Sequence, residues 1–252
     1  MGEVDYDQRL HEVYTQARSL APRSIGVWCD AFERHLPRHR PLTITDVGSG
    51  AGRFTPALAE RFGGPVIGVE PSTRMREVAA RDARHPDVEY VDGSAEDIPL
   101  AAASCDGALL FFVWHHVDDR ERAAHELARV VRAGGTLLVR TQLADRMPDL
   151  WWYDAYPRVR EVDASMFEPE ATTVQTLAAA GWRYQGSFDV PFEVASSRRA
   201  YLDRLRLRGI STFEHLTATE TDELFAALEV VVEGTPDPGP MVEHGTLLVF
   251  GR

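Results

Sequence analysis

A glycine-rich segment between an apolar run and a helical pattern carries the clearest chemical signal in the chain. It reads Asp46-Val47-Gly48-Ser49-Gly50-Ala51-Gly52, and Glu70 follows 24 residues after Asp46, at the end of the next apolar run. Glycines let a turn of backbone pass close to a ligand, and a carboxylate one strand away can accept hydrogen bonds from both hydroxyls of a ribose. The layout therefore predicts a nucleotide site at the carboxyl edge of a parallel sheet.

The spacing of these glycines indicates which nucleotide the turn suits. They follow the order G-x-G-x-G, and Arg53 stands where the dinucleotide pattern G-x-G-x-x-G has its third glycine. That glycine lets the helix pack closely against the strand in a pyrophosphate site. The sequence therefore disfavours a nicotinamide dinucleotide, although an NAD(P)-dependent oxidoreductase on the same kind of sheet stays as an alternative. Asp46 is expected to orient the turn rather than to touch the ligand.

Short apolar runs alternate with helical patterns on both sides of this turn, which is typical of parallel βαβ units. A helical segment to about residue 40 precedes them, and the pattern between 143 and 168 is irregular. We expect strands over 42–47, 66–69, 88–91, 106–113, 136–141, 182–192 and 245–250. We expect helices over 53–62, 72–84, 118–131, 172–180, 197–208 and 219–233.

Five segments, taken together in order and spacing, resemble the class I S-adenosylmethionine-dependent methyltransferases, and most closely their small-molecule branch. They are DVGSGAGRF, GVEPS, DGSAEDIPL, CDGALLFFVWHHVDD and ARVVRAGGTLLV, and the likeness covers residues 41–141. The resemblance implies an α/β, Rossmann-like, doubly wound sheet of seven strands, mostly parallel with an antiparallel last strand, and helical lid elements. It also implies S-adenosylmethionine as the cofactor.

Cofactor contacts follow from the resemblance position by position. Gly48, Ser49 and Gly50 would lie against the methionine part of the cofactor, Glu70 would hold the ribose hydroxyls, and Met75 would pack on the adenine. These assignments describe a turn that holds the amino acid and a carboxylate that holds the sugar.

The segment DGSAED would complete the adenine side of the site. The family often has Asp where this chain has Ser94, so the contact to the adenine amino group stays open, with the Ala95 amide and Glu96 as nearby substitutes. Phe111, at the end of the fourth strand, would reach the methionine. An aromatic ring there could make a cation–π contact with the sulfonium, worth roughly 0.5 to 2 kcal/mol, or could be an ordinary core residue.

Two further pairs of residues would border the region of methyl transfer. Tyr14 and Arg18 resemble a pattern in which the N-terminal helix closes over the cofactor, with Arg18 facing the methionine carboxylate. A solvated surface arginine is the alternative. His115 and His116 follow the fourth strand and are candidates for a general base, because histidine titrates near neutral pH. The alternative is that the two rings shape the pocket.

The acceptor side is expected from the region after the fifth strand. Trp151, Trp152, Tyr153 and Tyr156 would form part of a lid, with some rings in an aromatic acceptor pocket and others packed on the core. The segment 197–208 carries five arginines and predicts an amphipathic helix with a solvated charged face. An anionic acceptor is the alternative interpretation of those arginines.

Composition excludes several other classes. The chain has 252 residues, 27 basic residues that are all Arg, 39 acidic residues and a net charge of −12. A negative field disfavours nucleic acid as a partner, and the absence of lysine excludes a lysine Schiff base and a Walker-type P-loop. The nine His and two Cys show no metal-ligand spacing, and no G-x-S-x-G elbow is present.

Taken together, these observations predict one methyltransferase domain that methylates O, N or C of a small organic acceptor, with a secondary metabolite as one setting. A cofactor-binding protein without turnover is a further alternative. The acidic N-terminus, the two cysteines and the lack of a long apolar run lead us to expect a cytoplasmic protein without a membrane span. We expect an N-terminal helical cap over 1–40, a cofactor core over 41–142, acceptor-lid insertions over 143–215, and a C-terminal helix and last strand over 216–252.

Overall fold

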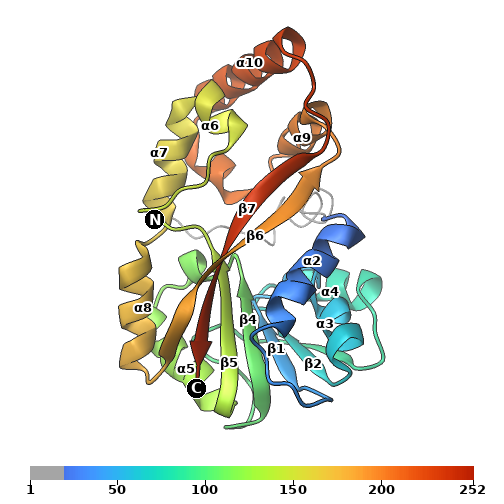
Figure 1. Ribbon diagram of the computed structural model, residues 1–252, viewed down its shortest axis with the longest axis vertical. Helices are drawn as coiled ribbons and strands as arrows, with labels where there is room; N and C mark the ends of the chain where they lie inside the picture. The colour runs from blue at the N-terminus through green and yellow to red at the C-terminus, as the bar shows by residue number, and fades with distance from the viewer. Residues whose placement is uncertain (1–19) are drawn as a thin grey trace.

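In residues 20–252, which the computed structural model describes, seven strands form one twisted sheet (Figure 1). The strands are β1 (Ile44–Val47), β2 (Val66–Val69), β3 (Val88–Val91), β4 (Cys105–Phe111), β5 (Val131–Thr141), β6 (Arg183–Ala195) and β7 (Met241–Gly251). Their order in the sheet is β3-β2-β1-β4-β5-β7-β6, and β7 runs antiparallel to both of its neighbours. The predicted fold class is confirmed, including the antiparallel last strand.

Helices cover both faces of this sheet and form a separate upper layer above its edge (Figure 1). The helices are α2 (Pro22–Glu33), α3 (Thr55–Phe62), α4 (Thr73–Asp82), α5 (Arg120–Val130), α6 (Trp151–Ala155), α7 (Pro157–Met166), α8 (Glu170–Ala179), α9 (Arg198–Leu205) and α10 (Ala218–Gly234), with short 3-10 helices η2 (Trp114–His116) and η3 (Ser211–His215). No helix within residues 20–252 is both long enough and apolar enough to span a bilayer.

Alternation along the strands divides the core into two clusters. Leu109 and Leu138 face one cluster with the apolar residues of α2 and α3, whereas Leu110 and Val139 face the other with α5 and α8. Successive side chains of a strand point to opposite faces, so a strand covered on both faces must be apolar throughout. This explains the near-continuous apolar run of the fourth strand.

Local capping sets the helix boundaries around the glycine-rich turn. The Ser72 hydroxyl accepts from the Met75 amide at 3.2 Å, and the Asp119 carboxylate accepts from the Arg122 amide at 3.0 Å. Gly63 ends α3 in the left-handed conformation, at φ 69°. The helices predicted over 53–62 and 72–84 thus form within these ranges, as Thr55–Phe62 and Thr73–Asp82.

Two expectations about elements are wrong. The residues 133–135 do not separate a helix from a strand, because β5 begins at Val131 and passes through a bulge between its pairing with Cys105 and with Gly107. Gly134 supplies the positive φ of 79° in this stretch. The irregular region after β5 contains α6 and α7, two short helices separated by the turn at Tyr156, with Pro157 at the first position of α7.

The antiparallel pair of strands β6 and β7 extends well beyond the sheet edge toward the upper helices (Figure 1). Only the part of β7 from Thr246 onward pairs with β5, whereas residues 241–245 pair with β6 alone. Side chains on this extension, such as Glu243, therefore stand above the carboxyl edge of the sheet.

Candidate active site

The turn after β1 is built from glycines in a conformation that other residues adopt poorly. Gly48, Gly50 and Gly52 have φ angles of 70°, 56° and 77°. The Gly48 amide donates to the Val69 carbonyl at 2.7 Å, which holds the turn against β2. A Cβ placed on Gly48 would lie 2.4 Å from a methyl carbon of Val113, so the close approach admits no side chain.

Glu70 at the end of β2 ties this turn to the next one. One carboxylate oxygen accepts from the Gly50 amide and the other from the Ser72 amide, each at 2.9 Å. The side chain is only 7% exposed. A carboxylate oxygen can accept more than one hydrogen bond. The residue therefore fits a ribose diol, since each oxygen can accept one hydroxyl.

A cavity with an empty volume of about 690 Å³, here called the glycine-turn cavity, opens beside this carboxylate. Eight of the residues predicted for the cofactor line it, namely Gly48, Gly50, Glu70, Met75, Ser94, Ala95, Glu96 and Phe111. The structure thus brings the separate sequence motifs into one site.

Among the predicted cofactor residues that the structure describes, Ser49 does not line this cavity. The Ser49 side chain is turned toward the sheet, since a Cβ on Gly68 would lie 2.8 Å from its hydroxyl oxygen. Only the backbone of Ser49 belongs to the turn. Tyr14 and Arg18 lie outside the described residues.

The segment at the far end of the glycine-turn cavity is held by its own hydrogen bonds. The Ser94 hydroxyl accepts from the Glu96 amide at 3.2 Å, and the Glu96 carboxylate accepts from the Asp118 amide at 3.1 Å. Met75 is buried in α4 and forms part of the cavity wall. This end offers an apolar surface beside backbone amides, which suits a planar base.

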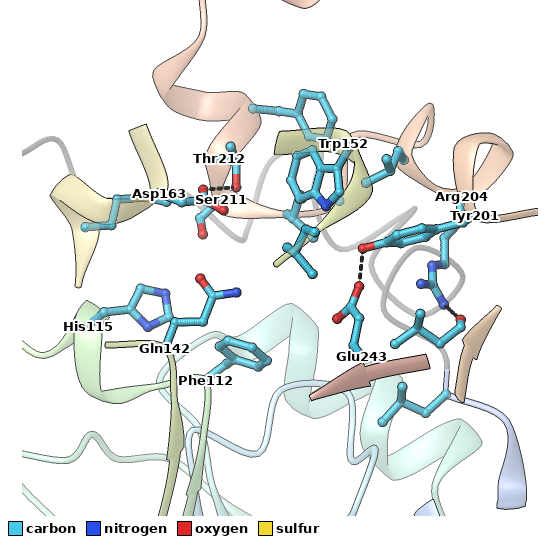
Figure 2. A pocket seen from close by; sticks show the side chains of 18 of the residues that line it. Phe112, His115, Gln142, Trp152, Asp163, Tyr201, Arg204, Ser211, Thr212 and Glu243 are labelled. Carbon is cyan, nitrogen blue, oxygen red and sulfur yellow. Dashed lines mark hydrogen bonds between the residues drawn. The ribbon is translucent and has the colours of Figure 1, made fainter. Parts of the chain in front are cut away.

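A second cavity, here called the upper cavity, lies between the sheet edge and the upper helices and has an empty volume of about 910 Å³ (Figure 2). Phe111 and Phe112 line both cavities. Phe112 has a positive φ of 60°, which is rare for a bulky residue. Its amide donates to the Arg140 carbonyl at 2.8 Å, and the Arg140 guanidinium lies 4.1 Å from its ring centre. Neighbours on β5 thus maintain this strained residue at the junction.

The two histidines after β4 face different cavities. His116 lines the glycine-turn cavity and His115 lines the upper cavity. Their ring centroids are 3.9 Å apart, and His115 also packs on Phe167 at 4.7 Å. Both rings therefore border the junction, as the sequence led us to expect of the candidate bases.

The aromatic cluster after β5 divides between the upper cavity and its support. Trp152 lines the cavity, and the Tyr153 hydroxyl donates to Asp163 at 2.5 Å. Trp151 packs against Tyr201, with ring centroids 6.0 Å apart. Tyr156 donates to a surface glutamate. Of the four rings proposed for the lid, only Trp152 reaches the cavity surface.

Several polar residues of the upper cavity had no signal in the sequence. Asp163 accepts from the Thr212 hydroxyl at 2.6 Å, and Glu243 accepts from the Tyr201 hydroxyl (Figure 2). Gln142 reaches the same space from the end of β5. These residues come from five separate segments of the chain, and only folding brings them together.

The arginines of α9 do not form a purely solvated face. Arg199 and Arg206 both pair with Glu229 of α10, and Arg204 donates to the Val194 carbonyl. These contacts fix α9 between β6 and α10. Arg204 is the arginine of this helix that lines the upper cavity.

Asp46 is buried beneath the glycine-rich turn, at 3% exposure, and accepts from the Thr55 hydroxyl at 2.8 Å. Burial raises the pKa of its carboxyl from 3.8 to about 6, and the bond from Thr55 partly opposes this rise. The carboxylate thus organises the first turn of α3 at the cost of holding a charge in the protein interior.

The raised pKa of Asp46 predicts a pH dependence of stability. Well below the unfolded pKa of 3.8 the carboxyl is protonated in both states, so the burial penalty is absent; it develops as pH rises from there to the folded pKa of about 6. Relative to Asp46→Asn, which carries no charge, the wild type should lose about 2 kcal/mol of unfolding free energy between pH 4 and pH 7. Urea unfolding of both proteins across this range measures the difference. Parallel profiles would contradict the prediction.

Comparison with known proteins shows which proteins this chain resembles. Residues 45–139 match the family model described as a methyltransferase domain. An uncharacterized methyltransferase of Mycobacterium tuberculosis is 38% identical over 125 residues, which cover 45% of this chain and 50% of the relative. The ubiquinone/menaquinone biosynthesis C-methyltransferase of Sinorhizobium fredii is 33% identical over 148 residues, covering 52% and 57%. The chain thus spans about half the length of the curated relatives it matches.

Solved structures share the architecture over nearly the whole chain. An Anabaena variabilis protein, whose name assigns it to the methyltransferases of an antibiotic biosynthesis pathway, superposes with a TM-score of 0.74 at 24% identity, covering 94% of this chain and 99% of that one. A geranyl diphosphate methyltransferase bound to sinefungin gives 0.58 at 20% identity, covering 90% and 77%. At these identities the likeness establishes the fold, which is that of Rossmann-like methyltransferases. The match over residues 45–139 and the shared fold support the resemblance to the class I S-adenosylmethionine-dependent methyltransferases.

Proposed function

We propose that this protein transfers the methyl group of S-adenosylmethionine to a small organic acceptor. The observation that carries the proposal is the junction at Phe111 and Phe112, where the glycine-turn cavity meets an aromatic-lined second cavity. Methyl transfer needs two ligands that meet end to end with water excluded between them. Two cavities with a shared aromatic wall provide that arrangement.

The residues of the glycine-turn cavity suit each part of the cofactor. Gly48 and Gly50 leave room for the amino-acid part, and the two carboxylate oxygens of Glu70 are acceptors suited to the ribose hydroxyls. Met75 and Ala95 offer an apolar surface for the adenine. When bound, the cofactor supplies an electrophilic methyl group on a sulfonium. Phe111 at the junction can stabilise that positive charge through its ring face.

Alignment and exclusion of water are the main tasks left to the protein. Holding two reactants in the reactive geometry can supply roughly 7 to 11 kcal/mol of the barrier. The upper helices close the acceptor side, and the buried bonds from Tyr153 and Thr212 to Asp163 fix α6, α7 and η3 to one another. The expected division into helical cap, cofactor core, lid insertions and C-terminal elements is part of this proposal.

A small organic molecule fits the upper cavity better than a polymer. Its walls are mainly apolar, and two carboxylates and two guanidinium groups line it, those of Asp163, Glu243, Arg53 and Arg204, so neither sign of charge dominates. The Anabaena variabilis neighbour is named for antibiotic biosynthesis, and this name supports a secondary metabolite as acceptor.

Calorimetry with S-adenosylmethionine and with its demethylated product tests the proposal directly. Both should bind with dissociation constants in the micromolar range, and NADH should not compete. Incubation with methyl-labelled cofactor and panels of phenols, amines and indoles should then label at least one acceptor. Lack of binding of either nucleoside at millimolar concentration would refute the proposal, as would tight binding of NADH.

A further inference from the structure

Two buried polar atoms at the upper cavity have no hydrogen-bond partner within the described part of the chain. They are the indole nitrogen of Trp152, a residue 2% exposed, and the side-chain carbonyl oxygen of Gln142. Buried polar groups in folded proteins nearly always have partners, so each such atom in a cavity wall points to a ligand. The indole N–H can only donate, and the carbonyl oxygen can only accept. A ligand group that serves both must have a lone pair and a hydrogen.

Glu243 faces the same space from the β7 extension. In the sheet, Glu243 lies opposite Phe192 of β6, in the part of β7 that extends beyond the end of β5. This position places the carboxylate above the sheet edge. Figure 2 shows Trp152, Gln142 and Glu243 pointing toward one cavity from three elements. The Tyr201 hydroxyl donates to this carboxylate and holds its orientation.

The charges around Glu243 favour a role in proton transfer. Burial raises the pKa of its carboxyl, while the bond from Tyr201 and the positive charges of Arg140 on β5 and Arg204 on α9 lower it. Asp163 on α7 also lines the cavity. A carboxylate whose pKa is moved toward neutrality accepts a proton more readily than an ordinary surface glutamate.

Hydrogen-bonding capacity and charge then select the ligand. A hydroxyl can accept from the Trp152 N–H and still donate its hydrogen, whereas a protonated amine has no lone pair for the indole. Asp163 and Glu243 line the cavity together with Arg53 and Arg204, so its charges balance and an uncharged acceptor needs no further counter-charge. Phe112, Phe167 and Phe213 in the walls suit an aromatic ring. Since a phenol loses its proton far more easily than an alcohol, a carboxylate base suits a phenol better.

We propose that the methyl acceptor is an uncharged phenol, that its hydroxyl accepts from the Trp152 N–H with its hydrogen directed to Glu243, and that Glu243 takes this proton. This inference rests on the proposed methyl transfer. A lone pair of the phenolic oxygen forms the bond to the methyl carbon, and the electrons of the breaking sulfur–carbon bond stay on sulfur. The electrons of the O–H bond stay on oxygen while the proton moves to the Glu243 carboxylate, which becomes neutral. Glu243 is thus a catalytic residue, and Tyr201 is a positioning residue.

Binding of a probe phenol tests the recognition. In protein saturated with the demethylated cofactor, calorimetry should show that naphthol binds more tightly than methoxynaphthalene, which lacks the hydrogen, and naphthoate, which is an anion. Trp152→Phe keeps a ring but removes the N–H, and should weaken naphthol binding roughly tenfold. Trp151→Phe is the matched control, because that side chain packs on Tyr201 away from the cavity wall, and it should leave the affinity within a factor of two.

Kinetics of Glu243→Gln test the proton transfer. The variant should lose roughly a hundredfold in kcat toward naphthol, with KM changed only a few-fold, because a general base typically contributes this much. The wild-type kcat should rise with pH through the ionisation of Glu243 and then level off, and this limb should disappear in the variant. Glu193→Gln on β6 is the control, since Glu193 lies outside the cavity wall and should keep the wild-type profile.

The outcomes separate this inference from the proposed function. If the cofactor does not bind, both fail. If it binds and methyl transfer occurs, but Glu243→Gln keeps the wild-type kcat and pH profile, or naphthoate binds as tightly as naphthol, only the phenol inference is overturned. If Glu243→Gln does not fold by circular dichroism, the comparison of Trp152→Phe with Trp151→Phe decides, and equal naphthol affinity in the two would reject the site.

Discussion

Replacing Glu70 with alanine should raise the dissociation constant for S-adenosylmethionine at least a hundredfold. The carboxylate accepts from the Gly50 and Ser72 amides, so its removal releases two turns, and it also removes both acceptors proposed for the ribose. A hydrogen bond to a charged group is worth roughly 1.5 to 3 kcal/mol, so the loss of two ribose contacts alone accounts for this change. Calorimetry with the demethylated cofactor measures it without turnover.

Two further substitutions separate the ribose contact from general damage to the fold. Glu70→Gln keeps one oxygen acceptor and should give an intermediate affinity. Glu89→Ala removes an exposed glutamate from the neighbouring β3 and should bind like the wild type. If Glu70→Ala retains wild-type affinity, the ribose is not held by this carboxylate.

Replacing Gly48 with alanine should reduce cofactor affinity more than tenfold and lower the melting temperature. The residue has a φ of 70°, and the added Cβ would lie 2.4 Å from a Val113 methyl group. The left-handed conformation alone costs a residue with a side chain roughly 1 to 2 kcal/mol. The clash must then move Val113, which lines the glycine-turn cavity, so the binding site changes together with the turn.

Other glycines of the chain offer matched controls for this variant. Gly63 has nearly the same φ, 69°, but open space around its Cβ position, so Gly63→Ala reports the conformational cost alone. Gly26 lies in the helix α2, and a Cβ added to it would meet no atom within 4 Å. Gly26→Ala should therefore be neutral or should stabilise the fold by roughly 0.5 to 1 kcal/mol. Equal cofactor affinity in Gly48→Ala and Gly63→Ala would show that the turn does not approach the ligand closely.

The part of the fold that could be predicted from the sequence is the part with local causes. The strands of the central sheet are apolar on both faces, and Ser72 and Gly63 mark helix ends through their own side-chain or backbone chemistry. The bulge in β5 was missed because paired glycines in a bulge and at the end of a helix give the same pattern. The short helices α6 and α7 were missed because neither is long enough to show a full apolar period.

The candidate site also has one part that could be predicted from the sequence and one part that could not. The glycine-rich turn and Glu70 are close in sequence and carry a recognisable spacing, so their juxtaposition in the glycine-turn cavity followed from the motif. No such spacing marks Asp163, Tyr201 and Glu243. Each becomes a cavity residue only through the packing of α7, α9 and the antiparallel pair β6–β7. Ser49 lies in the motif, but its side chain points toward the sheet and not into the cavity, because a position in a motif does not fix the direction of the side chain.

The extended antiparallel pair β6–β7 and the helices around it lie outside residues 45–139, the stretch that matches the methyltransferase-domain family model. Most of the upper cavity wall comes from these later segments. Under the proposed function, mutation there would change which acceptor is methylated and would leave the glycine-turn cavity intact. Chimeras that exchange the two portions between homologous enzymes are therefore a natural route to new acceptor preferences.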